Sequence, residues 1–124
     1  MLIKTGNSLK LKEIARLLDA EVISDSTDLD ADIMIVYSSD LMSDVLFFAP
    51  PDCILITGLT HPHVIRTAEI TRINAIVFVQ NKKPDSETVG LAKKKNIHLL
   101  VTPLSKFTAC GRLYMNGIRD CSEK

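Results

Sequence analysis

Small polar side chains follow each of four short apolar runs in this 124-residue chain. Hydroxyl and amide groups beside the first turn of a helix are suited to binding a small anion, such as a phosphate or a carboxylate, because the helix dipole is positive there. The ligand-binding candidates at these positions are Ser39, Asp40, Ser43, Thr57, Gly58, Thr60, His61, Gln80, Asn81, Thr102 and Ser105. The same residue types cap helices, so capping alone is the simpler interpretation of each position.

Two carboxylates, Asp40 and Asp44, are spaced four residues apart and could share one face of a helix. Together with Ser43 and His61 they could hold Mg²⁺ in a small enzyme of phosphoryl transfer or hydrolysis. The simpler interpretation is that Asp40 caps a helix over residues 41–48 and that the helix dipole stabilises Asp44 in the first turn. We therefore predict no catalytic residue and keep the magnesium enzyme as the alternative.

The histidines and cysteines do not show metal-ligand or disulfide spacing. His61-Pro62-His63 offers two imidazoles without a fixed third ligand, and His98 lies inside an apolar run, so we predict no metal site. The three cysteines, Cys53, Cys110 and Cys121, are an odd number without a CxxC motif, which argues against a disulfide framework. We expect Cys53 and Cys110 to be small buried residues in a reducing compartment.

Common catalytic and cofactor motifs are missing from the chain. The sequence contains no GxxxxGK[ST], GxGxxG, HExxH or GxSxG pattern. This excludes the usual nucleotide, zinc-protease and serine-hydrolase sites. We predict no cofactor.

The four apolar runs are rich in β-branched residues and start 20, 22 and 22 residues apart. Runs that are apolar throughout, instead of alternating with polar residues, are typical of parallel strands covered on both faces of a sheet. The predicted strands are residues 33–37, 53–57, 75–79 and 97–101, with a short edge strand at 21–23.

Each apolar run is followed by a segment with helical signals. Pro62 suits the first turn of a helix, and Gly117 can adopt the left-handed conformation that ends one. The predicted helices are residues 11–18, 41–48, 62–73, 85–95 and 103–116.

This order of strands and helices predicts an α/β fold, with one small, doubly wound, mainly parallel sheet of four to five strands flanked by helices. In such sheets a ligand binds beyond the carboxyl ends of the strands, near a reversal of strand order. We expect a single domain over residues 1–124, with its core at about 8–118. Residues 24–32 are predicted to form an acidic surface loop, and residues 119–124 a frayed tail.

The net charge of zero conceals two opposed halves. Residues 1–62 hold ten acidic and four basic residues, a formal charge of −6, and residues 63–124 hold five acidic and eleven basic residues, a formal charge of +6. We expect these halves to form adjoining acidic and basic faces that could favour protein contact.

The composition argues against membrane and nucleic-acid partners. No apolar stretch approaches the roughly 20 residues that span a bilayer, and Met1–Gly6 lacks the apolar core of a secretory signal, so we expect a cytoplasmic protein. With no tryptophan, two tyrosines and four phenylalanines, the chain offers little for stacking bases, and we predict no nucleic-acid partner.

Three segments, Ser39–Leu46, Leu55–Pro62 and Leu100–Phe107, resemble a stand-alone DRTGG domain over about residues 8–118. The chain is similar, more distantly, to the N-terminal domain of HPr kinase/phosphorylase, which implies a small parallel α/β fold. The sequence departs from the signature of the DRTGG family: Leu59-Thr60 stands where the resemblance implies Asp-Arg, and Val79-Gln80-Asn81 where it implies Thr-Gly-Gly.

The resemblance implies an accessory module of larger regulatory proteins that favours dimer formation. The expected function is thus a non-catalytic regulatory or scaffold domain that homodimerises and binds a partner protein. A small anionic metabolite or nucleotide could occupy the crevice at the carboxyl ends of the strands.

Overall fold

The computed structural model describes residues 8–24 and 29–120. The predicted flexible N-terminus before residue 8, the centre of the acidic loop at 25–28 and Cys121 lie outside these residues. The helices are α1 (Leu11–Leu17), α2 (Met42–Phe48), α3 (Pro62–Thr71), α4 (Ser86–Lys95) and α5 (Lys106–Met115). The strands are β1 (Leu9–Lys10), β2 (Glu21–Val22), β3 (Asp32–Ile33), β4 (Val36–Ser38), β5 (Ile54–Thr57), β6 (Ala75–Phe78) and β7 (His98–Val101).

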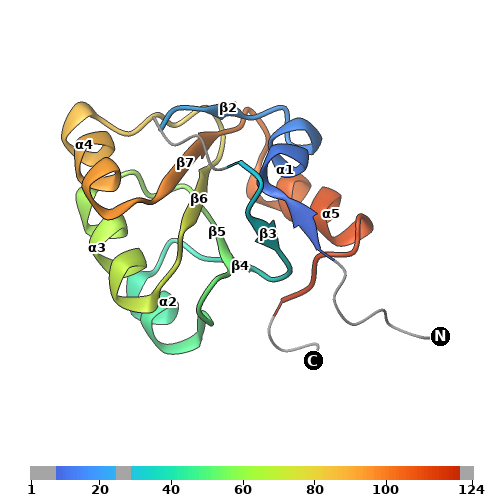
Figure 1. The fold of residues 1–124 in the computed structure, drawn as a ribbon, viewed down its shortest axis with the longest axis horizontal. Coiled ribbons are helices and arrows are strands. Elements are labelled where there is room, and N and C mark those ends of the chain that lie inside the picture. Colours follow the sequence, from blue (N-terminus) through green and yellow to red (C-terminus); the bar gives the residue numbers. More distant parts are fainter. Residues whose placement is uncertain (1–7, 25–28, 121–124) are drawn as a thin grey trace.

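The main sheet has five strands in the order β2-β7-β6-β5-β4 (Figure 1). Strands β4 to β7 are parallel, and β2 pairs antiparallel with β7 at the edge. The α/β fold with a mainly parallel sheet is therefore confirmed. The parallel strands follow one another in a single direction, so the described part of the sheet has no reversal of strand order between β4 and β7.

Helices cover both faces of this sheet, as predicted. Right-handed crossovers that advance in one direction place successive helices on the same face, and α2, α3 and α4 all pack there. After β7 the chain turns back, and α5 joins α1 on the opposite face. The alternation along β6 shows both interfaces, because Ala75 and Val77 face α1 and α5 while Ile76 and Phe78 face the other three helices.

One predicted strand, residues 33–37, is wrong as a single element. Ile33 belongs to β3, which pairs antiparallel with β1, and Val36 begins β4 in the main sheet. The apolar run therefore contributes residues to two different sheets. Its composition alone does not indicate where one strand ends and the next begins. The pairing also places a strand at Asp32, within the segment predicted to be a loop.

The start of the predicted C-terminal tail is held by the sheet edge. The backbone of Arg119 lies parallel to Ile35, accepts a hydrogen bond from Val36 N at 3.0 Å and donates one to Met34 O at 3.4 Å. Residue 119 is thus part of the fold, which contradicts its place in the predicted tail.

Helix ends follow the expected chemistry at most positions. Asp85 and Ser105 cap α4 and α5 by accepting hydrogen bonds from Thr88 N and Thr108 N. Gly117 has a φ of 99°, which confirms its left-handed role after α5. None of the described helices is long and apolar enough to cross a membrane.

The acidic and basic halves of the sequence do not form separate faces. The sheet order places β6 and β7, from the basic half, between β2 on one side and β5 and β4 on the other. Among residues 8–24 and 29–120, three ion pairs join the halves within one molecule: Glu21–Lys83, Asp40–Lys106 and Asp19–Arg112. These ion pairs within the molecule neutralise part of the charge that we expected to favour contact with another protein.

Candidate functional site

The carboxylate of Asp40 occupies the carboxyl end of β5. Its Oδ1 accepts hydrogen bonds from Gly58 N at 2.7 Å and from Thr57 Oγ1 at 3.1 Å, and its Oδ2 pairs with Lys106 Nζ at 3.0 Å. The prediction that Asp40 caps α2 is wrong, because that helix has Leu41 at its N-cap and no side-chain cap. The donors at the end of β5 and the ammonium of α5 bind the carboxylate instead.

A second ammonium group, that of Lys82, lies near the backbone of Gly58. A Cβ atom placed on Gly58 would lie 3.3 Å from Lys82 Nζ and 3.5 Å from Asp40 Oδ2. The absence of a side chain at Gly58 thus lets the tip of Lys82 approach the backbone. Asp40, Gly58, Lys82 and Lys106, which we call the strand-end cluster, form an anion-binding arrangement in which the anion is the protein's own carboxylate.

The electrostatic environment favours the ionised form of Asp40. Burial by itself would raise the pKa of this carboxyl. The hydrogen bonds from Gly58 N–H, Lys106 and Thr57, with the positive charge of Lys106, outweigh burial and lower the pKa below its ordinary value of 3.8. The carboxylate therefore stays charged at neutral pH.

The two buried candidates, Thr57 at the end of β5 and Thr102 directly after β7, form the same local turn on either side of β6. Each hydroxyl accepts a hydrogen bond from the backbone N–H two residues later, at Leu59 and at Leu104. Thr57 also donates to Asp40, whereas Thr102 donates to the carbonyl of Leu18 after α1. Both hydroxyls thus serve the fold.

Gln80 and Asn81 form a tight turn after β6. Their φ angles of 58° and 56° lie in the left-handed region, where glycine is favoured. Their backbone N–H groups donate to Leu104 O at 2.8 Å and to Thr102 O at 2.9 Å, which ties the end of β6 to the loop after β7. These are the positions where the family resemblance implies Gly-Gly, and the left-handed geometry explains that preference.

The remaining candidates lie at helix starts. His61 caps α3, since its Nδ1 accepts a hydrogen bond from His63 N at 3.2 Å, and Ser39 Oγ accepts one from Leu41 N at 3.0 Å. The carbonyl of Thr60 accepts a hydrogen bond from Thr88 Oγ1, and the hydroxyl of Ser105 one from Thr108 N. Ser43 is exposed in the first turn of α2.

Most of the chain matches a known protein family. The family model for the DRTGG domain matches residues 13–115. The chain belongs to the DRTGG family. A solved structure with a TM-score of 0.69 and 20% identity contains the CBS and DRTGG domains of the regulatory region of Clostridium perfringens pyrophosphatase, complexed with the activator diadenosine tetraphosphate. The match covers 88% of this chain and 47% of that one, so this DRTGG domain spans about half of its structural relative. No curated protein matches the chain.

The residues of the magnesium-enzyme alternative do not form one site in this DRTGG domain. Asp40 pairs with the ammonium group of Lys106, and the Nδ1 atom of His61 accepts a hydrogen bond from its own helix. Within residues 8–24 and 29–120, no group of three or more His, Cys, Asp or Glu side chains could hold a metal ion. A divalent cation at Asp40 would also be repelled by Lys82 and Lys106.

Sequence reasoning missed the two lysines of the strand-end cluster. Lys106 carried a usable signal, because it stands in the first turn of a helix, where the dipole disfavours a cation. A lysine at that position indicates a nearby anion, which here is Asp40. Lys82 follows the left-handed turn after β6 in this DRTGG domain. Its position in the sequence does not indicate a nearby anion.

Proposed function

We propose that this DRTGG chain is a non-catalytic regulatory or scaffold domain that homodimerises and binds a partner protein. Its membership of the DRTGG family supports this proposal. Further support comes from the similar fold of the pyrophosphatase regulatory region, which binds an activator. We take residues 1–124 as one domain with its core at about 8–118, and we place its action in the cytoplasm.

The observation that carries the proposal is the exposed apolar surface of α2. Phe47 is 81% exposed, and Leu41, Leu46 and Phe48 are also exposed. The rings of Phe47 and Phe48 contact each other edge to face, with their centroids 4.8 Å apart. Large apolar side chains grouped on one surface helix are typical of protein contacts. We call these four residues the α2 apolar surface and propose that it forms the dimer contact.

We further propose that a small anionic ligand acts at the strand-end cluster. Such a ligand would compete with the carboxylate of Asp40 for Lys82, Lys106 and the N–H of Gly58. Asp40 belongs to the loop that leads into α2, so displacing its side chain would shift the start of the α2 apolar surface. Ligand binding at the strand-end cluster could in this way change the affinity of the dimer.

Sedimentation equilibrium tests the dimer. Phe47→Asp removes the most exposed side chain of the α2 apolar surface at little cost to the fold. Met115→Asp is the matched control, because Met115 is 85% exposed on α5, on the opposite face of the sheet. We expect the wild type and Met115→Asp to be dimers and Phe47→Asp to dissociate at least about tenfold more readily. A monomeric wild type at micromolar concentration would refute the dimer.

A further inference from the structure

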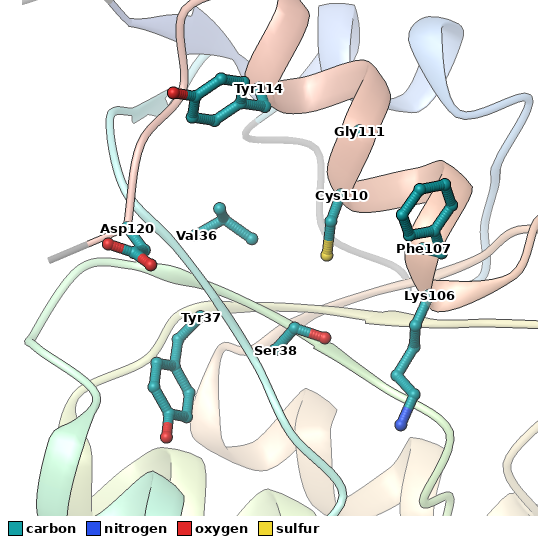
Figure 2. A pocket seen from close by; sticks show the side chains of 9 residues that line it. All are labelled: Val36, Tyr37, Ser38, Lys106, Phe107, Cys110, Gly111, Tyr114 and Asp120. Carbon is teal, nitrogen blue, oxygen red and sulfur yellow. The ribbon is translucent and has the colours of Figure 1, made fainter. Parts of the chain in front are cut away.

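An open cavity of about 560 Å³ lies between β4 and α5, and Lys106 of the strand-end cluster is one of its lining residues (Figure 2). Its size falls within the range of about 300–1,000 Å³ that is typical of small-molecule sites. The walls come from Val36 and Ser38 of β4 and from Phe107, Cys110, Gly111 and Tyr114 of α5. We call it the β4–α5 cavity.

The cavity lies where one face of α5 is only partly packed, because Cys110 contacts the core while Phe107 and Tyr114 on the same face are exposed. Phe107, Cys110, Gly111 and Tyr114 follow one another at the i, i+3, i+4, i+7 spacing of an apolar helix stripe. The core, however, is contacted by the neighbouring stripe with Ala109 and Leu113. Gly111 deepens the hollow, since no atom lies within 4 Å of the position that its Cβ would take.

The strand side of the cavity is the edge of the main sheet. Arg119 covers the outer edge of β4 only at Val36, by accepting a hydrogen bond from its backbone N–H. Within the described residues no strand lies beside Ser38, which is also a wall of the cavity. The β4–α5 cavity therefore lies at the edge of the sheet, and a ligand could enter it without displacing core residues.

Charged side chains lie at both ends of the β4–α5 cavity. Figure 2 shows Lys106 at one end and Asp120 at the other, beside Tyr114. The side chain of Lys106 is 41% exposed although it pairs with Asp40, so its ammonium group can still donate to a ligand. An anionic group would therefore be attracted to the Lys106 end. At the other end the charge of Asp120 lies near the guanidinium of Arg119, whose Cζ is 4.0 Å from the centroid of the Tyr114 ring.

The middle of the cavity is apolar and uncharged. The rings of Phe107 and Tyr114 flank its mouth, and Val36 forms part of its floor. Burial raises the pKa of the Cys110 thiol, more than its hydrogen bond with Ser38 and the charge of Lys106 lower it, so this sulfur is neutral at pH 7. A flat aromatic ring suits such a surface.

We propose that the β4–α5 cavity binds a small aromatic molecule that carries an anionic group at one end and a hydrogen-bond donor at the other. The anion contacts Lys106, the ring lies against Phe107 and Tyr114, and the donor faces Asp120. This site is distinct from the dimer contact on α2, so the dimer and this inference can fail independently. Lys106 belongs to both the cavity and the strand-end cluster, so the two ligand sites are told apart by Gly111, which lines only the cavity.

Three probes separate the contributions of the ring, the anion and the donor. In NMR titrations of the full chain, 4-aminobenzoate has all three groups, benzoate lacks the amine, and aniline lacks the carboxylate. We expect 4-aminobenzoate to shift the backbone signals of residues 36–38 and 106–114, and each simpler probe to bind about three- to tenfold more weakly. Equal affinity for all three probes, or shifts confined to Gly58 and Lys82, would overturn the proposal.

Two glycine variants test the location of the site. Gly111→Leu fills the cavity, whereas Gly90→Leu makes the same change in the middle of α4, where a Cβ likewise meets nothing within 4 Å. Both changes raise helix propensity, so both variants should fold. We expect Gly111→Leu to weaken 4-aminobenzoate binding by at least about tenfold and Gly90→Leu to leave it unchanged. Unchanged binding in Gly111→Leu would contradict the site.

A lysine pair tests the charge assignment. Lys106→Met removes the cation at the end of the cavity, and Lys82→Met removes the other cation near Asp40, which does not line the cavity. We expect only Lys106→Met to weaken binding, by about tenfold. If Gly111→Leu instead alters the oligomeric state without affecting the probes, the cavity is covered by a second copy of the chain, and the ligand proposal is wrong.

Discussion

The carboxylate of Asp40 accepts a hydrogen bond from the backbone N–H of Gly58 at 2.7 Å, across the ends of two neighbouring parallel strands. Residues at such strand ends commonly bind anionic ligands, and here the protein supplies the anion itself. Because Lys106 also pairs with this carboxylate, Asp40 joins the loops after β4 and β5 to the start of α5. The candidate ligand site is thereby a structural site as well.

Replacing Asp40 tests its contribution to stability and the pH at which it acts. The pKa of Asp40 is lower in the folded chain than its ordinary value of 3.8, so its contribution is present above that value and is lost as the pH falls through the folded pKa. Asp40→Asn should be about 1 kcal/mol less stable than the wild type at pH 7. The difference should shrink toward pH 3 in urea unfolding curves, and a difference independent of pH would contradict the assignment.

The same substitution should have the opposite effect on anion binding. Asp40→Asn removes the internal anion but keeps an acceptor for Gly58, so inorganic phosphate should raise the melting temperature of this variant more than that of the wild type. Lys82→Met should reduce the effect of phosphate. Lys94→Met, at the exposed end of α4, is the control and should not change it. An equal phosphate response in all four proteins would argue against a ligand at the strand-end cluster.

The turn after β6 can be stabilised by glycine. Gln80 holds a left-handed φ of 58° at a cost that glycine does not incur, so Gln80→Gly should raise the free energy of unfolding by about 0.5–1 kcal/mol. Asn81→Gly is the comparison, because asparagine tolerates this conformation better and should gain less. Chemical denaturation measures both changes. A loss of stability in Gln80→Gly would show that its side chain makes a stabilising contact.

The buried hydroxyl of Thr102 links the sheet to α1. It donates to the carbonyl of Leu18 and accepts from Leu104 N, so Thr102→Val leaves a buried carbonyl without this donor. We expect a loss of about 1–3 kcal/mol in the free energy of unfolding. Thr102→Ser, which keeps the hydroxyl, should retain more of the stability than Thr102→Val. The order is reversed if packing of the methyl group matters more than the hydrogen bonds.

Local patterns predicted the elements that build the sheet and its helices. The continuous apolar runs at β5, β6 and β7 are buried on both faces, which is why their strand type, parallel pairing and helical flanks could be inferred. The cap at His61 was also predictable, because a cap contacts backbone within three residues of itself. The helix predicted from residue 103 includes Ser105, but that helix begins at Lys106 with Ser105 as its cap.

The roles of Asp40, Lys106 and Arg119 depend on contacts between distant parts of the sequence. Asp40 could have capped α2, but donors 18 and 66 residues away bind its carboxylate instead. The β1–β3 pairing and the bridge at Ile35 likewise join segments that no local pattern relates. By itself the sequence thus determined which segments form strands and helices, because burial and capping are encoded locally. Only the tertiary structure decided which charges meet at the strand ends and where α5 leaves a cavity, because those depend on how distant elements pack.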